Sequence, residues 1–210
     1  MQTCYIFSAA EGLPQKLEIK KEDLIIAADL GFENAKKSGV KPDVVLGDFD
    51  SLGYEPENIE IIKHPVRKDD TDTLLAIKVG LGRGYKKFVI YGGTGGRLDH
   101  TIANIQSLAF LAENNAFGIL KGDKYCVTAI KNRSVSFSEK AKGNVSVFAF
   151  EKASGVNISG LLYEIQNAEL SPYFPLGVSN EFIGNKSEIS VKNGTLIINY
   201  DGDEETASIK

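Results

Sequence analysis

Short apolar runs alternate with helix-like stretches over the first 122 residues, and few folds accommodate that pattern. The runs expected to be buried strands are Cys4–Ala9, Leu24–Ala28, Val44–Leu46, Ile59–Ile62, Phe88–Tyr91 and Phe117–Leu120. One helix is expected over Asp72–Leu81, entered through Thr71 or Asp70 as its cap. A second is expected over His100–Glu113, entered through Asp99. This alternation predicts a mostly parallel, Rossmann-like α/β sheet.

After Gly122 the pattern changes to short β-rich segments separated by Gly, Asn and Ser. These segments are Tyr125–Ile130, Val145–Phe150, Ile189–Lys192 and Leu196–Tyr200. Between the last two, Asn193-Gly194 predicts a β-hairpin with a type I′ turn. We therefore expect an α/β domain over residues 1–122 and a small antiparallel β-sandwich over residues 123–210.

Charge and cysteine content exclude several classes of protein. The formal net charge is −4 and neither half has a basic excess, which argues against a nucleic-acid binder. Cys4 and Cys126 fit no metal or redox spacing, and no signal segment precedes them, so we expect a reduced, cytoplasmic protein. The apolar runs are far shorter than the roughly 20 residues that a membrane-spanning helix requires.

A pair of carboxylates follows the run Val44–Leu46. Asp48 and Asp50 point the same way if the backbone stays extended, because side chains alternate faces. Two converging hard oxygen ligands suit Mg²⁺. The open alternative is a solvated turn in which Asp and Ser side chains cap the backbone.

A second acidic group, Asp69-Asp70-Thr71-Asp72, stands at the start of a predicted helix. Asp69 and Asp72 are three residues apart and can share a face. Helix capping explains one or two of these acids but not all of them. The acids from Asp48 to Asp72 together would repel a triphosphate. Each pair of like charges 4 Å apart costs on the order of 4 kcal/mol at an effective dielectric of about 20. A bridging metal ion removes that conflict.

The third element is a glycine-rich turn, Gly92-Gly93-Thr94-Gly95-Gly96, between a strand and a helix. Glycines let backbone N–H groups approach phosphate oxygens. The turn matches neither a Walker A motif nor the dinucleotide fingerprint. Arg97 strengthens a phosphate-binding interpretation, because its guanidinium can hold phosphate with two hydrogen bonds. His100 could equally be a first-turn residue, and Asn104 an exposed helix position.

Together these motifs resemble the thiamin pyrophosphokinase family. The matching residues are Asp48-Phe49-Asp50-Ser51, Lys68-Asp69-x-Thr71-Asp72 and Gly95-Gly96-Arg97-Leu98-Asp99-His100-Thr101-x-Ala103-Asn104. In the second half Gly160-Leu161-Leu162-Tyr163 and Gly177-Val178-Ser179-Asn180-Glu181-Phe182 are similar to the family's carboxyl-terminal motifs. Five motifs in register cover nearly the whole chain.

The resemblance implies an enzyme that uses Mg²⁺, ATP and thiamin, and a homodimer with each thiamin site shared between subunits. The implied metal ligands are Asp48, Asp50, Asp69 and Asp72, which with Arg97 and Asp99 form the implied catalytic set. The implied contacts to ATP or other substrate groups are Asp29, Ser51, Thr71, Thr94, Gly95, Gly96, His100 and Asn104. The implied thiamin contacts are Tyr163, Ser179 and Asn180, with Tyr163 stacking on the cationic thiazolium.

The implied reaction is attack of the thiamin hydroxyl on the β-phosphorus of ATP, with AMP leaving. Asp99 is the candidate for orienting that hydroxyl. One departure from the family stands at Leu30, where the family usually has glycine after Asp29. Leu30 indicates that this position does not need a positive φ here or that the loop is reshaped. Asp29 is thus left between a substrate role and a turn or cap role.

Two other functions remain open from the sequence. Asp48-Phe49-Asp50 after a strand also fits the nucleophile and acid of an aspartyl-phosphate phosphohydrolase. Leu52 stands where that class usually has Thr or Val, and the glycine turn has no role there. A non-catalytic thiamin or nucleotide sensor is the second alternative, but it has little need for so many potential metal ligands.

Overall fold

The computed structural model describes residues 2–10, 12–14, 17–47, 54, 56, 58–63 and 69–209. The fold is mixed α/β, with a large mixed sheet and a second, antiparallel sheet. The chain divides into two compact units. One comprises Met1–Ser107 with Leu120–Asp123, and the other comprises Leu108–Ile119 with Lys124–Lys210.

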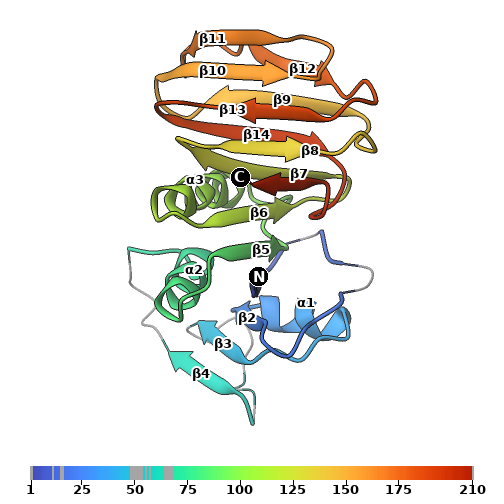
Figure 1. The fold of residues 1–210 in the computed structure, drawn as a ribbon. Coiled ribbons are helices and arrows are strands. Elements are labelled where there is room, and N and C mark those ends of the chain that lie inside the picture. The colour runs from blue at the N-terminus through green and yellow to red at the C-terminus, as the bar shows by residue number, and fades with distance from the viewer. Residues whose placement is uncertain are drawn as a thin grey trace. The chain divides into compact units, whose positions relative to one another are not determined.

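The first unit is built on a parallel sheet (Figure 1). Its strands lie in the order β5 (Lys87–Tyr91), β1 (Thr3–Phe7), β2 (Leu24–Ala28), β3 (Val44–Gly47) and β4 (Glu60–Lys63). Helices α1 (Gly31–Lys37) and α2 (Asp72–Gly82) belong to this unit. Helix α3 (Leu98–Glu113) and strand β6 (Phe117–Lys121), which follows it, are each divided between the two units. The parallel arrangement confirms the direction predicted from alternating strands and helices.

The helix starts refine the predictions. Thr71 is the cap of α2, because its side chain accepts a hydrogen bond from the Leu74 N–H at 3.2 Å. Helix α3 begins at Leu98, two residues before the predicted start, so the prediction of Asp99 as an entry cap is wrong. Gly95 and Gly96 have φ of 82° and 63°, which turns the chain just before the helix.

The second unit contains antiparallel strands in two groups. One group has the order β12 (Gly177–Glu181), β9 (Asn144–Ala149), β14 (Thr195–Asp201), β7 (Tyr125–Lys131). The other has the order β11 (Ile165–Leu170), β10 (Ala153–Ser159), β13 (Ser187–Ser190), β8 (Ser134–Phe137), β15 (Ala207–Ile209). One buried cluster contains Val147 and Ile198 from the first group and Val135 and Ile189 from the second. Both groups therefore contribute to one apolar core.

The hairpin predicted at Asn193-Gly194 does not form. Strands β13 and β14 belong to different sheets, and Asn193 is not among the residues with positive φ. Its backbone instead exchanges two hydrogen bonds with Ser154 of β10, at 2.9 and 3.1 Å. Long-range pairing thus outweighs the local turn preference of Asn-Gly. In the part of the chain that the structure describes, every helix is too short or too polar to span a membrane.

Candidate active site

A cavity of about 330 Å³ opens where strands β1, β2 and β5 of the first unit end. Strand β1 lies between β2 and β5: the connections from β1 through β2 and β3 to β4 run one way across the sheet, and the connection from β4 to β5 returns to the other side of β1. Open α/β sheets bind ligands at such a point. The cavity is lined by Ser8, Ala9, Ala10, Ala28, Asp29, Leu30, Thr71, Asp72, Thr73, Gly92, Gly93, Gly95, Arg97, His100 and Asn104.

The structure brings together seven of the residues predicted to bind substrate or metal. They are Asp29, Thr71, Asp72, Gly95, Arg97, His100 and Asn104. Of the other predicted residues that are described, Asp69, Thr94, Gly96 and Asp99 belong to the first unit without lining the cavity. Asp48, Asp50 and Ser51 lie outside the described residues.

The turn after β2 explains the departure at Leu30. Asp29 has a φ of 49°, whereas Leu30 has a φ of −55° and is the N-cap of α1. The interpretation that position 30 does not need a positive φ is therefore confirmed. A Cβ on Gly31 would lie 1.8 Å from the Phe7 carbonyl oxygen, so only glycine fits there. Asp29 accordingly serves the turn and lines the cavity as well.

Asn104 holds the glycine turn in place. Its side chain is 5% exposed, and its Nδ2 donates to the Gly93 carbonyl at 2.8 Å. The alternative of an exposed helix position is therefore wrong. Gly92 has a φ of 66°, which keeps the turn close to the end of β1.

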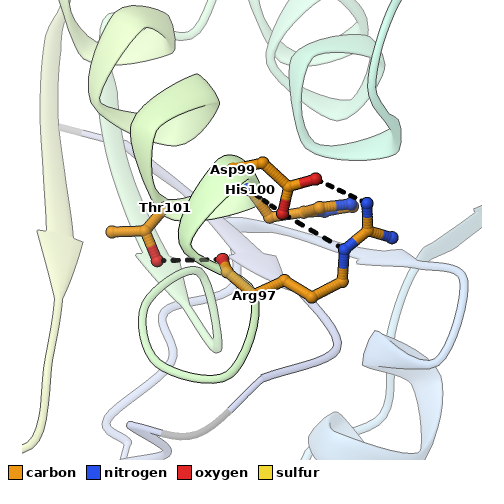
Figure 2. A network of polar contacts seen from close by, with 4 residues as sticks. All are labelled: Arg97, Asp99, His100 and Thr101. Carbon is orange, nitrogen blue, oxygen red and sulfur yellow. Dashed lines mark hydrogen bonds and ion pairs between the residues drawn. The ribbon is translucent and has the colours of Figure 1, made fainter.

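Arg97 and Asp99 form a two-pronged ion pair (Figure 2). The Arg97 Nη2 donates to Asp99 Oδ2 at 2.6 Å, and Nε donates to Oδ1 at 3.2 Å. The His100 N–H also donates to Oδ1 at 3.0 Å. The hydrogen bonds that Arg97 donates to Asp99 hold the pKa of the Asp99 carboxyl below its usual range and raise the pKa of the Arg97 guanidinium. Both side chains are largely exposed, so solvent screens the pair and leaves Arg97 accessible.

Several side chains with oxygen donors line the cavity. Asp29 and Asp72 line it together with Ser8 and Thr73, and hard oxygen donors of this kind suit Mg²⁺. Among the described residues no group of three or more His, Cys, Asp or Glu could hold a metal ion. Since Asp48 and Asp50 are not described, the four-carboxylate metal site stays a prediction.

The predicted thiamin residues lie together in the second unit. The Asn180 Oδ1 accepts from the Tyr163 N–H at 2.9 Å, and its Nδ2 donates to the Tyr163 carbonyl at 2.7 Å. Asn180 therefore fixes the backbone that carries Tyr163, whose side chain is 65% exposed. Ser179, beside Asn180, has a φ of 60° at an irregular point of β12.

Sequence reasoning missed a wall of the cavity. Ser8–Ala10 directly follows β1, and Thr73 belongs to the first turn of α2. The position of Ser8 at the carboxyl end of a buried strand was the available signal. The residue types of the segment Ser8–Ala10 match no phosphate-binding motif, so the sequence gave no reason to select these residues.

A parallel sheet with a glycine turn, an arginine and carboxylates at its carboxyl edge defines the class of α/β proteins that bind phosphate-containing ligands there. Family comparison is more specific. Residues 15–118 match the catalytic domain of thiamin pyrophosphokinase, and residues 133–196 match its vitamin B1 binding domain. The chain belongs to the thiamin pyrophosphokinase family, whose members are thiamin diphosphokinases.

Individual relatives agree with this assignment. Thiamine pyrophosphokinase of Bacillus subtilis is 28% identical over 193 residues, covering 83% of this chain and 86% of the relative. Thiamin pyrophosphokinase 1 of Caenorhabditis elegans is 26% identical over 176 residues, covering 78% and 71%. The crystal structure of the Bacillus subtilis enzyme shares the fold, with a TM-score of 0.81 at 24% identity, covering 96% of this chain and 100% of that one.

Proposed function

We propose that this chain transfers the pyrophosphoryl group of ATP to the hydroxyl of thiamin, giving thiamin diphosphate and AMP, with Mg²⁺ as its cofactor. The observation that carries the proposal is the cavity at the carboxyl edge of the parallel sheet, which is lined by Arg97, by glycines of the turn and by Asp72. Cationic and backbone donors suit phosphate oxygens, and carboxylates suit the accompanying cation.

In this proposal the chain acts mainly by positioning and electrostatics. Arg97 and the glycine turn bind phosphate oxygens, and Asp99 orients the thiamin hydroxyl. Asp48, Asp50, Asp69 and Asp72 would hold Mg²⁺, which when bound neutralises negative charge that develops on the phosphates. The oxygen donors at Asp29 and Asp72 support this choice of cofactor.

We further propose that residues 1–122 bind ATP and Mg²⁺, and that residues 123–210 form a β-sandwich that binds thiamin and dimerises. Support comes from large apolar residues that stay exposed in the second unit, among them Leu162, Tyr163, Tyr173, Phe174, Leu176 and Val178. Large apolar side chains that are exposed together on one surface are typical of interaction sites. A second copy of the chain is the occupant that the family resemblance implies.

A cytoplasmic location is part of the same proposal. The two cysteines, Cys4 and Cys126, are both buried and form no disulfide with each other. Secreted domains of this size more often carry disulfides, so a reducing compartment suits the chain.

One assay tests the activity against its alternatives. The protein is incubated with ATP, Mg²⁺ and thiamin, and the products are separated by chromatography. Equal amounts of AMP and thiamin diphosphate are expected. Release of inorganic phosphate that does not depend on thiamin would identify a phosphohydrolase. Binding of thiamin or ATP without turnover would identify a sensor.

Arg97→Lys is expected to lower kcat/KM for ATP at least about tenfold, the equivalent of roughly 1.4 kcal/mol. Lysine keeps the charge but lacks the fork that binds two oxygens together. Steady-state kinetics measure the loss. Arg83→Lys is the matched control, because Arg83 pairs with Glu60 and does not line the cavity. If the two variants had the same kcat/KM for ATP, the proposal that Arg97 binds phosphate would be wrong.

A further inference from the structure

The Ser8–Ala10 segment forms a wall of the cavity that no motif marks. On one side its backbone is attached to the loop after β5. The Ser8 N–H donates to the Tyr91 carbonyl and the Ala10 N–H to the Gly92 carbonyl, each at 2.8 Å. A Cβ on Gly92 would lie 2.4 Å from the Ser8 oxygen and 2.8 Å from the Ala10 oxygen, so the two loops are in close contact.

The carbonyl groups of the same segment are bound by one side chain. Asn34 of α1 is 7% exposed, and its Nδ2 donates to the Ser8 oxygen at 2.7 Å and to the Ala10 oxygen at 3.0 Å. An amide nitrogen carries two N–H groups, so both of its donors are used on this segment. Asn34 does not line the cavity.

Ser8 connects the segment to the start of helix α2, where Asp72 lies. Its hydroxyl lies 2.9 Å from the Thr73 hydroxyl, and both residues are buried and line the cavity. Thr73 follows directly after Asp72 in the first turn of α2. The segment is thereby hydrogen-bonded to α1, to the glycine turn and to the helix that carries Asp72.

We propose that Asn34 is a positioning residue for the transfer reaction: it fixes Ser8–Ala10, and through the Ser8–Thr73 contact it fixes the start of α2 at the cavity. Asn34 acts through these residues and not by touching a substrate. The proposal rests on the proposed function, because the cavity must be where ATP or thiamin reacts.

The test compares isosteric variants of the whole protein. Asn34→Asp keeps the size of the side chain but sets carboxylate oxygens against two carbonyl oxygens, which repel each other. We expect kcat/KM to fall about thirtyfold for Asn34→Asp and about fivefold for Asn34→Ala, which only removes the donors. Gly92→Ala displaces the same segment from its other side, so it is expected to reduce kcat/KM as well.

Thr128→Val is the control for stability. Thr128 is fully buried in the second unit, and its hydroxyl donates to the Gly118 carbonyl at 2.7 Å. Its loss is expected to lower the unfolding midpoint and leave kcat/KM unchanged. If the two Asn34 variants lowered the midpoint without lowering kcat/KM more than Thr128→Val, Asn34 would be only structural and the proposal would fail. Asn34→Ala decides the matter if Asn34→Asp does not fold.

Thr73→Ala tests the route to α2. Because both side chains would act through Ser8, the double variant with Asn34→Ala is expected to lose less kcat/KM than the product of the two single losses. A loss equal to that product would show that Asn34 and Thr73 act independently. The proposed connection from Asn34 through Ser8 and Thr73 to α2 would then be wrong. If wild-type protein made no thiamin diphosphate, the proposed function would fail, and the role of Asn34 in that reaction would fail with it; failure of the Asn34 proposal alone requires an active wild-type protein.

Discussion

Asp48→Asn and Asp50→Asn are each expected to reduce turnover to below about 1% of wild type while leaving the protein folded. Each change removes a negative charge and the oxygen ligand that Mg²⁺ prefers, with almost no change in volume. Strand β3 ends at Gly47, which immediately precedes Asp48 in the sequence. Thiamin diphosphate formation at limiting and saturating Mg²⁺ measures the effect.

Asp70→Asn is the matched control for these variants. Asp70 belongs to the second acidic group, but its carboxylate binds the Lys78 Nζ at 2.6 Å and does not line the cavity. The Asp70→Asn variant is expected to keep most of the wild-type activity. Near-wild-type turnover of Asp48→Asn or Asp50→Asn at limiting Mg²⁺ would contradict the metal assignment. Thermal unfolding of every variant excludes loss of the fold as the cause.

Restoration of activity by mixing two inactive proteins is the second large effect expected. Asp48→Asn inactivates the metal-binding part of the site. The double variant Tyr163→Ala with Ser179→Ala inactivates the thiamin-binding part. If each site is shared between two chains, a mixed dimer carries one intact site of two. Random exchange of equal amounts makes about half of the dimers mixed, so roughly a quarter of wild-type activity should return.

Tyr163 and Ser179 suit this experiment better than Asn180. The Asn180 carboxamide hydrogen-bonds the backbone of Tyr163, so its removal would also disturb the local fold. Native mass spectrometry of differently tagged subunits verifies that exchange has occurred. Absence of activity after verified exchange would mean that each site is built within one chain, and the proposal of a shared site would be wrong.

Strands and helices with strong local signals were predicted closely from the sequence. Strand β2 occupies the predicted Leu24–Ala28, and all five of its residues are buried. Helix α2 begins at the predicted Asp72, because Thr71 caps it. In such elements the apolar run or the cap decides the structure, and neither depends on distant contacts.

Strands whose residues are mostly polar could not be found in this way. Strands β11 and β12 are largely exposed and lie at the edges of their sheets. An edge strand is defined by hydrogen bonds to one neighbour, and its sequence need not be apolar. The same limit explains why the pairing of Asn193 with Ser154 was missed.

The residues of the candidate site likewise fall into those that could be predicted from the sequence and those that could not. Gly95 and Arg97 were predicted because glycine and arginine have specific uses around phosphate. Asn34 and Thr73 were not, because a buried amide or hydroxyl acquires its role from the backbone opposite it. In both residues the partner lies in a segment distant in the sequence, at Ser8 to Ala10.

The turn after β2 has a consequence for how this sequence can change over evolutionary time. Leu30 is 38% exposed with a negative φ, so the backbone at this position accepts many residue types. Gly31 is one position away, and any side chain on it would collide with the carbonyl oxygen of Phe7. Substitutions at position 30 should therefore be compatible with the turn, whereas glycine should be kept at position 31. At the departure from the usual Asp-Gly pair, Leu30 has a negative φ that any residue type can adopt.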